Sequence, residues 1–159
     1  MIKPQPRFMK EAIRQALIAR DKNDYAVGAV LVKNNEIIAF ASNRSKRDES
    51  PIAHAETLVV IEGSKKLGKR HLTDCILYCT HEPCPMCASV IVWARLKGLI
   101  YGARYSDMKK YRKQKANNNY LWRTIDISCE RIFKKSTEKI SIVKDFLRNE
   151  CISLFHNEI

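Results

Sequence analysis

Two short motifs, thirty positions apart, constrain this 159-residue chain more than any other feature of its sequence. His54-Ala55-Glu56 is followed by Pro83-Cys84-Pro85-Met86-Cys87. One imidazole and two thiolates would give a zinc ion three protein ligands and leave the fourth tetrahedral position to water, as in catalytic zinc sites. A purely structural zinc would take four protein ligands. We therefore predict that the chain folds so that His54, Cys84 and Cys87 meet around one metal ion.

The residue types around each motif are typical of a helix N-terminus. Proline is tolerated in a first helical turn, and Cys84 and Cys87, three positions apart, share one helix face. The positive end of such a helix is expected to lower the pKa of both thiols. Glu56 lies about 200° around a helix from His54, so the two meet only where the helix end points at the metal. There Glu56 can move a proton without binding zinc.

A Cys-x-x-Cys pair also occurs in zinc ribbons and in redox dithiols, which are the alternative interpretations. A ribbon needs a second close pair, but the other cysteines, Cys75, Cys79, Cys129 and Cys151, are spaced four, fifty and twenty-two apart. A redox dithiol would leave the His-Ala-Glu motif unexplained. No run approaches the roughly twenty apolar residues of a membrane helix, and no signal-peptide core is present, so we expect a cytoplasmic protein.

The hydrophobic pattern alternates between helical and strand periods. Its length favours one domain, residues 1–159. We expect a first helix that ends before Asp21, a hairpin around Asn34-Asn35, and a helix from the first motif to Gly68. Strands are expected at 75–79, 99–102 and 140–143, and helices at 84–95 and 145–155, whereas 107–119 could be a helix or a mobile loop. This order predicts an α/β fold, a three-layer α/β/α sandwich around a mixed five-stranded sheet, with both zinc motifs at helix N-termini on one side of it.

Together these residues resemble the zinc-dependent cytidine deaminase-like superfamily, in the branch of bacterial tRNA adenosine deaminases and guanine deaminases. Residues 27–32, 43–44 and 101–104 are similar to the tRNA enzymes, whereas residues 74–78 and 93–95 are closer to guanine deaminases. The resemblance covers the chain to about Asp107. It implies one Zn²⁺ per chain, a homodimer, and hydrolytic deamination of a nucleobase in which Glu56 shuttles a proton while ammonia leaves.

Three further residues are predicted to contact the substrate. In these families an Asn eleven residues before the metal His hydrogen-bonds the target base, and Asn43 occupies that position. Its alternative interpretation is a turn residue. Ala55 lies between the ligand and the acid. His81 stands where an apolar residue or Cys is expected, so it either faces the substrate or is a solvent-exposed or core-paired histidine.

The net charge of +12 favours a polyanionic partner. Residues 95–123 hold nine basic residues and one acid, Asp107, interleaved with aromatic rings at Tyr105, Tyr111, Tyr120 and Trp122. This pattern favours nucleic acid, although a charge run can also be a solvated face. Together with the resemblance to the tRNA enzymes, it makes adenosine in tRNA our first prediction, with free guanine, cytosine or their nucleosides in salvage as the alternative. A non-catalytic nucleic-acid-binding subunit of an editing heterodimer is a further alternative, against which the intact Glu56 argues.

Overall fold

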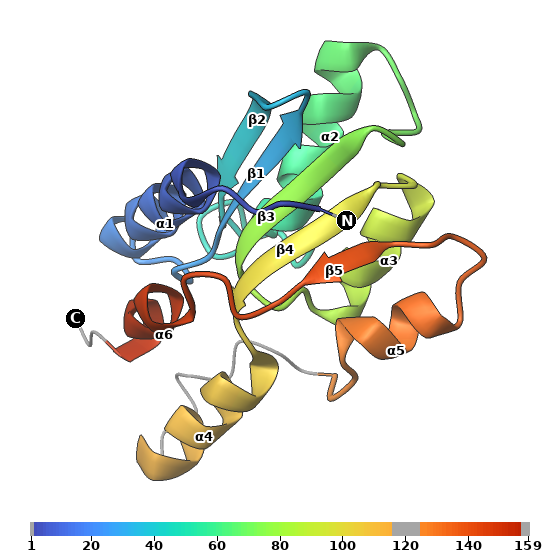
Figure 1. The fold of residues 1–159 in the computed structure, drawn as a ribbon. Helices are drawn as coiled ribbons and strands as arrows, with labels where there is room; N and C mark the ends of the chain where they lie inside the picture. Colours follow the sequence, from blue (N-terminus) through green and yellow to red (C-terminus); the bar gives the residue numbers. More distant parts are fainter. Residues whose placement is uncertain (1, 116–124, 157–159) are drawn as a thin grey trace.

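A mixed five-stranded sheet in the order β2-β1-β3-β4-β5 lies at the centre of the protein (Figure 1). The computed structural model describes residues 2–115 and 125–156. The strands are β1 (Gly28–Lys33), β2 (Glu36–Ser42), β3 (Cys75–His81), β4 (Gly98–Ala103) and β5 (Ser141–Val143). β1 is antiparallel to β2 and β3, whereas β4 is parallel to β3 and β5. The predicted mixed sheet is confirmed.

Helices cover both faces of this sheet (Figure 1). α1 (Pro6–Asp21) and α6 (Arg148–His156) lie on one face, and α2 (Ala55–Leu67), α3 (Pro85–Trp93) and α5 (Cys129–Lys134) lie on the other. α4 (Tyr105–Lys115) follows β4 and packs against α6. The predicted three-layer sandwich is therefore confirmed. No helix within residues 2–115 and 125–156 combines the length and apolar character needed to span a bilayer.

The first hairpin shows how local sequence sets the strand register. Asn34 and Asn35 link β1 to β2 with positive φ angles of 49° and 65°, which a tight hairpin turn requires and Asn tolerates. At the start of β1, Gly28 lies against the backbone of α1. A Cβ atom there would be 2.0 Å from the carbonyl oxygen of Ala12. Glycine at this position therefore lets α1 approach the sheet.

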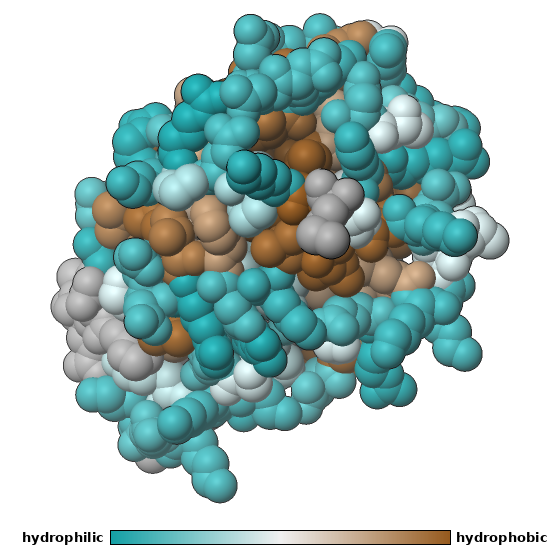
Figure 2. Space-filling model, in the orientation of Figure 1, coloured by the Kyte–Doolittle hydropathy of each residue, from teal (hydrophilic) through white to brown (hydrophobic). Residues whose placement is uncertain are grey.

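Two apolar cores, one on each face, hold the layers together. Val59 of α2, Ile91 of α3 and Phe133 of α5 belong to one core. Met9 of α1 and Phe155 of α6 belong to the other, which Met108 and Tyr111 of α4 extend. On the α1 and α6 face, apolar surface shows between hydrophilic side chains (Figure 2). Because helices cover strands β1, β3 and β4 on both faces, the sequences of these strands are nearly continuous apolar runs.

Several helix boundaries differ from the predictions. α1 includes Asp21, α6 begins at Arg148 rather than at residue 145, and no helix was predicted where α5 lies. The helix after Cys84 ends at Trp93 rather than Arg95, because Arg95 has a φ of 52° and leaves the helical region. Residues 105–115 of the basic segment form α4, so the helical alternative is confirmed there. Residues 116–119, Tyr120 and Trp122 lie outside the described residues.

Candidate active site

The zinc motifs meet where two neighbouring helices begin. His54 is the N-cap residue of α2 and Cys84 is the N-cap residue of α3, with Cys87 in the first turn of α3. The Nδ1 atom of His54 lies 3.6 Å from Sγ of Cys84 and 3.5 Å from Sγ of Cys87. The three donor atoms are all within 4.8 Å of one another. The packing of α2 and α3 in one layer thus joins residues thirty positions apart.

This donor set fits a zinc ion. Zinc bonds of about 2.3 Å to sulfur and about 2.0 Å to nitrogen, at a tetrahedral angle, place an S and an N ligand about 3.5 Å apart. The two observed N···S distances, 3.6 and 3.5 Å, agree with that value. Thr57 adds a contact from the first turns of α2, with its Oγ1 3.6 Å from Sγ of Cys87. One imidazole and two sulfurs leave a fourth tetrahedral position for water or substrate.

The charges of the ligands depend on one another. A hydrogen bond with Cys87 and another with His54 lower the pKa of the Cys84 thiol, although burial opposes the shift. The pKa of Cys87 is raised, first by its hydrogen bond to Cys84 and then by burial. Contact with Cys84 raises the pKa of His54. The opposite shifts of the two thiol pKa values arise first from the hydrogen bond between the two sulfurs.

A pocket of about 520 Å³ opens directly onto the metal ligands. His54, Cys84 and Glu56 contribute to its lining. Glu56 sits in the first turn of α2 and is only 4% exposed. Its carboxylate is not one of the three grouped metal donors. The arrangement places a buried acid beside the zinc ligands, outside the ligand set.

Asn43 lies in the same pocket wall, just after β2. Its side chain is buried, and its Nδ2 group donates to Oδ1 of Asp24 at 2.6 Å and to Oγ of Ser45 at 3.0 Å. The backbone N–H of Asn43 donates to the carbonyl of Val27. Asp24 was not singled out from the sequence. A single acidic residue in the loop between a helix and a strand belongs to no recognisable motif. The contact of Asp24 with Asn43 joins residues nineteen positions apart.

His81 also lines the pocket, at the end of β3. Its Nδ1 lies 3.1 Å from Oγ1 of Thr80, which accepts the backbone N–H of Gly28 at 3.2 Å. The imidazole packs on the ring of Phe155, with the ring centroids 5.2 Å apart. Because His81 is only 4% exposed, the solvent-exposed alternative is wrong. Ala55, by contrast, is buried in the core on the α2 and α3 face and is not among the described residues that line the pocket.

Residues 2–103 match the family model for the cytidine and deoxycytidylate deaminase zinc-binding region. The chain belongs to this family of zinc-binding deaminases. Its zinc site is therefore the metal site of the family, and the cofactor is Zn²⁺.

Relatives of this deaminase family member include both types of enzyme that its sequence resembles. A tRNA-specific adenosine deaminase of Bacillus subtilis is 48% identical over 96 residues, which span 60% of this chain and 60% of that protein. A tRNA-specific adenosine deaminase of Buchnera aphidicola is 38% identical over 149 residues, covering 92% of this chain and 83% of the relative. A guanine deaminase of Bacillus subtilis is 39% identical over 103 residues, covering 65% and 64%.

The fold comparison extends over nearly the whole chain. A solved structure from a study of A-to-I editing by tRNA:A34 deaminases superimposes with a TM-score of 0.78 at 27% identity. The match covers 94% of this chain and 99% of that one. The cytidine deaminase-like fold of this family member therefore includes the helices beyond the zinc-binding region.

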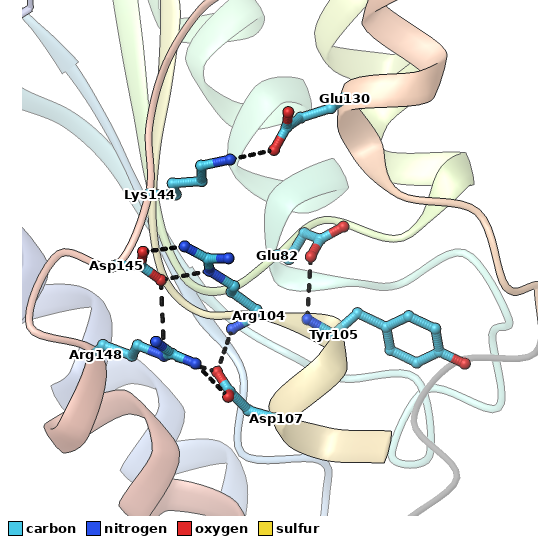
Figure 3. A network of polar contacts seen from close by, with 8 residues as sticks. All are labelled: Glu82, Arg104, Tyr105, Asp107, Glu130, Lys144, Asp145 and Arg148. Carbon is cyan, nitrogen blue, oxygen red and sulfur yellow. Dashed lines mark hydrogen bonds and ion pairs between the residues drawn. The ribbon is translucent and has the colours of Figure 1, made fainter. Parts of the chain in front are cut away.

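Those later helices complete the pocket of this deaminase. Tyr105 and Met108 of α4 line it together with Ile125. Glu82, next to the zinc motif, accepts the backbone N–H of Tyr105 at 3.0 Å (Figure 3). It also accepts the backbone N–H of Cys129 at 3.2 Å. The start of α4 and the start of α5 are thus both bonded to the residue before the Pro-Cys motif.

Ion pairs hold α4 against α6 on the far side of Glu82 (Figure 3). Arg104 donates two hydrogen bonds to Asp145, and Arg148 donates two to Asp107, the shorter at 2.6 Å. The backbone N–H of Arg104 also donates to Asp107 at 2.9 Å. Paired guanidinium and carboxylate groups of this kind fix orientation as well as distance. The network therefore sets where α4 lies relative to the pocket.

Proposed function

We propose that the protein is a zinc-dependent hydrolytic deaminase, working within a single domain, that converts adenosine to inosine in tRNA. The observation that carries the proposal is the pocket itself, which is lined by two of the three zinc donors, His54 and Cys84, and by the buried non-ligand Glu56, while the donor atom of Cys87 lies within 4.8 Å of the other two. Hydrolytic removal of an amine needs an activated water and a group that carries a proton. A pocket of about 520 Å³ is within the usual range for small-molecule sites.

Each residue of the site has a role in this proposal. His54, Cys84 and Cys87 would hold the zinc. When bound, zinc supplies a Lewis acid that brings the pKa of water close to neutrality. Glu56 takes the proton from the attacking water and returns it to the leaving amine, so that ammonia departs and a carbonyl remains. Asn43 and His81 hold the base, and the surrounding wall excludes bulk water.

The preference for tRNA rests on the relatives and on positive charge at the pocket. Lys46 lines the pocket, and its Nζ lies 4.3 Å from the centre of the Tyr25 ring, which lines it too. On the other wall, Nζ of Lys109 lies 5.4 Å from the ring centre of Tyr105. Aromatic rings with adjacent cations suit stacked bases and phosphates. Two of the relatives reported above are tRNA-specific adenosine deaminases.

We further propose a cytoplasmic homodimer. Large apolar side chains are exposed on the helix layer that carries the zinc ligands, with Trp93 of α3 81% exposed and Ile61 of α2 44% exposed. Exposed apolar surface of this kind is typical of subunit contacts. Light scattering coupled to size-exclusion chromatography tests it, because a monomeric mass at micromolar concentration would contradict the proposed dimer.

Ammonia release by the zinc-loaded protein tests the proposed activity. The panel holds guanine, cytosine, adenine, their nucleosides and total tRNA, and inosine in the tRNA is measured in parallel. Turnover of tRNA alone, with inosine formed, is the expected result. Turnover of a free base or nucleoside would instead make this a salvage enzyme. Zinc binding without any turnover would favour a non-catalytic subunit.

Salt dependence of tRNA binding tests the basic helix separately. Lys110 and Lys113 lie on α4, whereas Lys109 also pairs with Asp126 at 2.6 Å. Replacing Lys110 and Lys113 by Gln should weaken tRNA binding and lower the slope of log K against log salt by about 1 for each phosphate that is no longer neutralised. The matched control replaces Lys65 and Lys66, in the last turn of α2. If replacing Lys65 and Lys66 weakened tRNA binding as much as replacing Lys110 and Lys113, α4 would have no specific role in tRNA binding.

A further inference from the structure

Glu82 places one carboxylate between the two helices that begin at the pocket wall. Its Oε2 accepts the backbone N–H of Tyr105, the first residue of α4, at 3.0 Å. Its Oε1 accepts the backbone N–H of Cys129, the first residue of α5, at 3.2 Å. The first N–H groups of a helix have no partner within the helix, and negative charge is favourable at that end. One side chain therefore caps two helices, with one oxygen for each.

The backbone of Glu82 belongs to the zinc-binding part of the chain. Its N–H donates to the carbonyl of Ala103 at 2.8 Å, next to the point where His81 of β3 pairs with Ala103 of β4. Two residues after Glu82, Cys84 is the N-cap residue of α3 and one of the three metal donors. The carboxylate of Glu82 is not part of that donor group. It is therefore carried by backbone that is held between the sheet and a zinc ligand.

The two capped helices flank a part of the wall that lies beyond the zinc-binding region, which the family model matches over residues 2–103. Tyr105 and Met108 of α4 line the pocket, and so does Ile125, four positions before α5 begins. The two bonds to Glu82 fix residues 105 and 129, which bracket these wall residues in the sequence. The place of this wall relative to the zinc ligands therefore depends on one side chain.

We infer that Glu82 is a positioning residue that places this part of the wall relative to the zinc site, and so sets the affinity for the substrate rather than the rate of the chemical step. The inference rests on the proposed function, because the pocket must bind a base-containing substrate. Wall contacts that are equal in the ground state and the transition state change KM and leave kcat unchanged. If the wall is in place in fewer molecules, the apparent affinity falls in proportion to that fraction.

Glu82→Gln tests the inference with almost no change in shape. The introduced amide has one acceptor oxygen and one NH₂ group, so it can accept one of the two backbone N–H groups and must turn its own donor toward the other. α4 is also held by Arg148, which donates to Asp107 at 3.0 and 2.6 Å (Figure 3). We therefore expect the substitution to displace the wall without unfolding α4.

The experiment measures kcat, KM and zinc content of Glu82→Gln with the substrate that the wild type turns over. We expect KM to rise about tenfold or more, kcat to stay within about threefold of wild type, and zinc to stay bound. Glu130→Gln is the matched control, since Glu130 lies in the first turn of α5 and accepts Nζ of Lys144 at 2.9 Å. It should leave both constants unchanged.

Three results would overturn the inference. An unchanged KM in Glu82→Gln would show that the wall does not depend on this carboxylate. A lower kcat at unchanged KM is what a direct part in the chemistry, or a smaller fraction of folded enzyme, predicts. Loss of zinc would show that Glu82 supports the metal site instead of the wall.

Failure of the proposed function gives a different result, in which the wild type turns over no base, nucleoside or tRNA in the panel. Hydrogen exchange of the Tyr105 and Cys129 amides, followed by NMR, then decides the placement of the wall without activity. At least one of the two amides should exchange about tenfold or more faster in Glu82→Gln and not in Glu130→Gln. Unchanged exchange of both would overturn the inference. If Glu82→Gln is too unstable to purify, Glu82→Asp, with a side chain one methylene shorter, replaces it with the same expected directions.

Discussion

Replacing Glu56 by Gln should separate proton transfer from metal binding. The substitution keeps the shape of a side chain that is 4% exposed and removes only its ability to carry a proton. Because the carboxylate is outside the group of three metal donors, the zinc content should stay at one ion per chain. General acid–base groups contribute about 10²- to 10⁴-fold to a rate, so kcat should fall by that factor, which corresponds to about 3–5 kcal/mol in the barrier.

The same substitution should not cost stability. Burying a carboxylate is more expensive than burying an amide of the same size, so the melting temperature of Glu56→Gln should equal or exceed that of the wild type. The assay pairs ammonia release under saturating substrate with zinc quantification on the same sample. Glu62→Gln, an exposed position on α2, is the matched control and should leave kcat unchanged. Zinc loss in Glu56→Gln, or a kcat within about threefold of wild type, would refute the assigned role.

Three further predictions concern the metal, the sheet and acid stability. Cys87→Ala should lose zinc and lower the melting temperature together, as shown by metal analysis and thermal unfolding, because the metal links α2 to α3. Gly28→Ala should destabilise the fold by about 1–3 kcal/mol in urea unfolding, since its Cβ meets helix backbone, whereas Gly63→Ala meets the end of the Leu31 side chain and should cost less. Burial alone would raise the pKa of Asp107, but hydrogen bonds from Arg148 and from the Arg104 N–H lower it overall. The contribution of Asp107 to the free energy of unfolding is therefore complete above about pH 4 and is lost as the pH falls through its lowered pKa. In urea unfolding measured against pH, Asp107→Asn should lose less stability over that acidic range than the wild type.

The zinc site and the order of elements up to β4 were predictable because each has a local signal, whereas α5 was not predicted. The His54 and Cys84 motifs contain the residue types that bind zinc. The proline at the start of α3 indicates where the helix that follows Cys84 begins. The Asn34-Asn35 turn and the apolar run of β1 indicate a hairpin without any long-range information. These features can be predicted from the sequence because residues that are close together in the chain determine them.

The pocket wall was not predictable in the same way. Glu82 bonds to Cys129 across 47 positions and Asp24 bonds to Asn43 across 19, and neither contact leaves a periodic pattern. Ala55 is buried in the core where α2 packs on the sheet, and its predicted substrate contact stays a prediction. Side-chain partners at long separation depend on packing that a single sequence does not display.

The bond from Glu82 to Cys129 also bears on the order in which the enzyme matures. Synthesis proceeds from the N-terminus, and the last zinc ligand, Cys87, leaves the ribosome 42 residues before Cys129. All three donors are therefore in the nascent chain while the wall formed by α4 and Ile125 is still absent. The bond from the Cys129 N–H to Glu82 can form only after Cys129 has been synthesised, so the contact that ties the start of α5 to Glu82 is made after all three donors are in the chain.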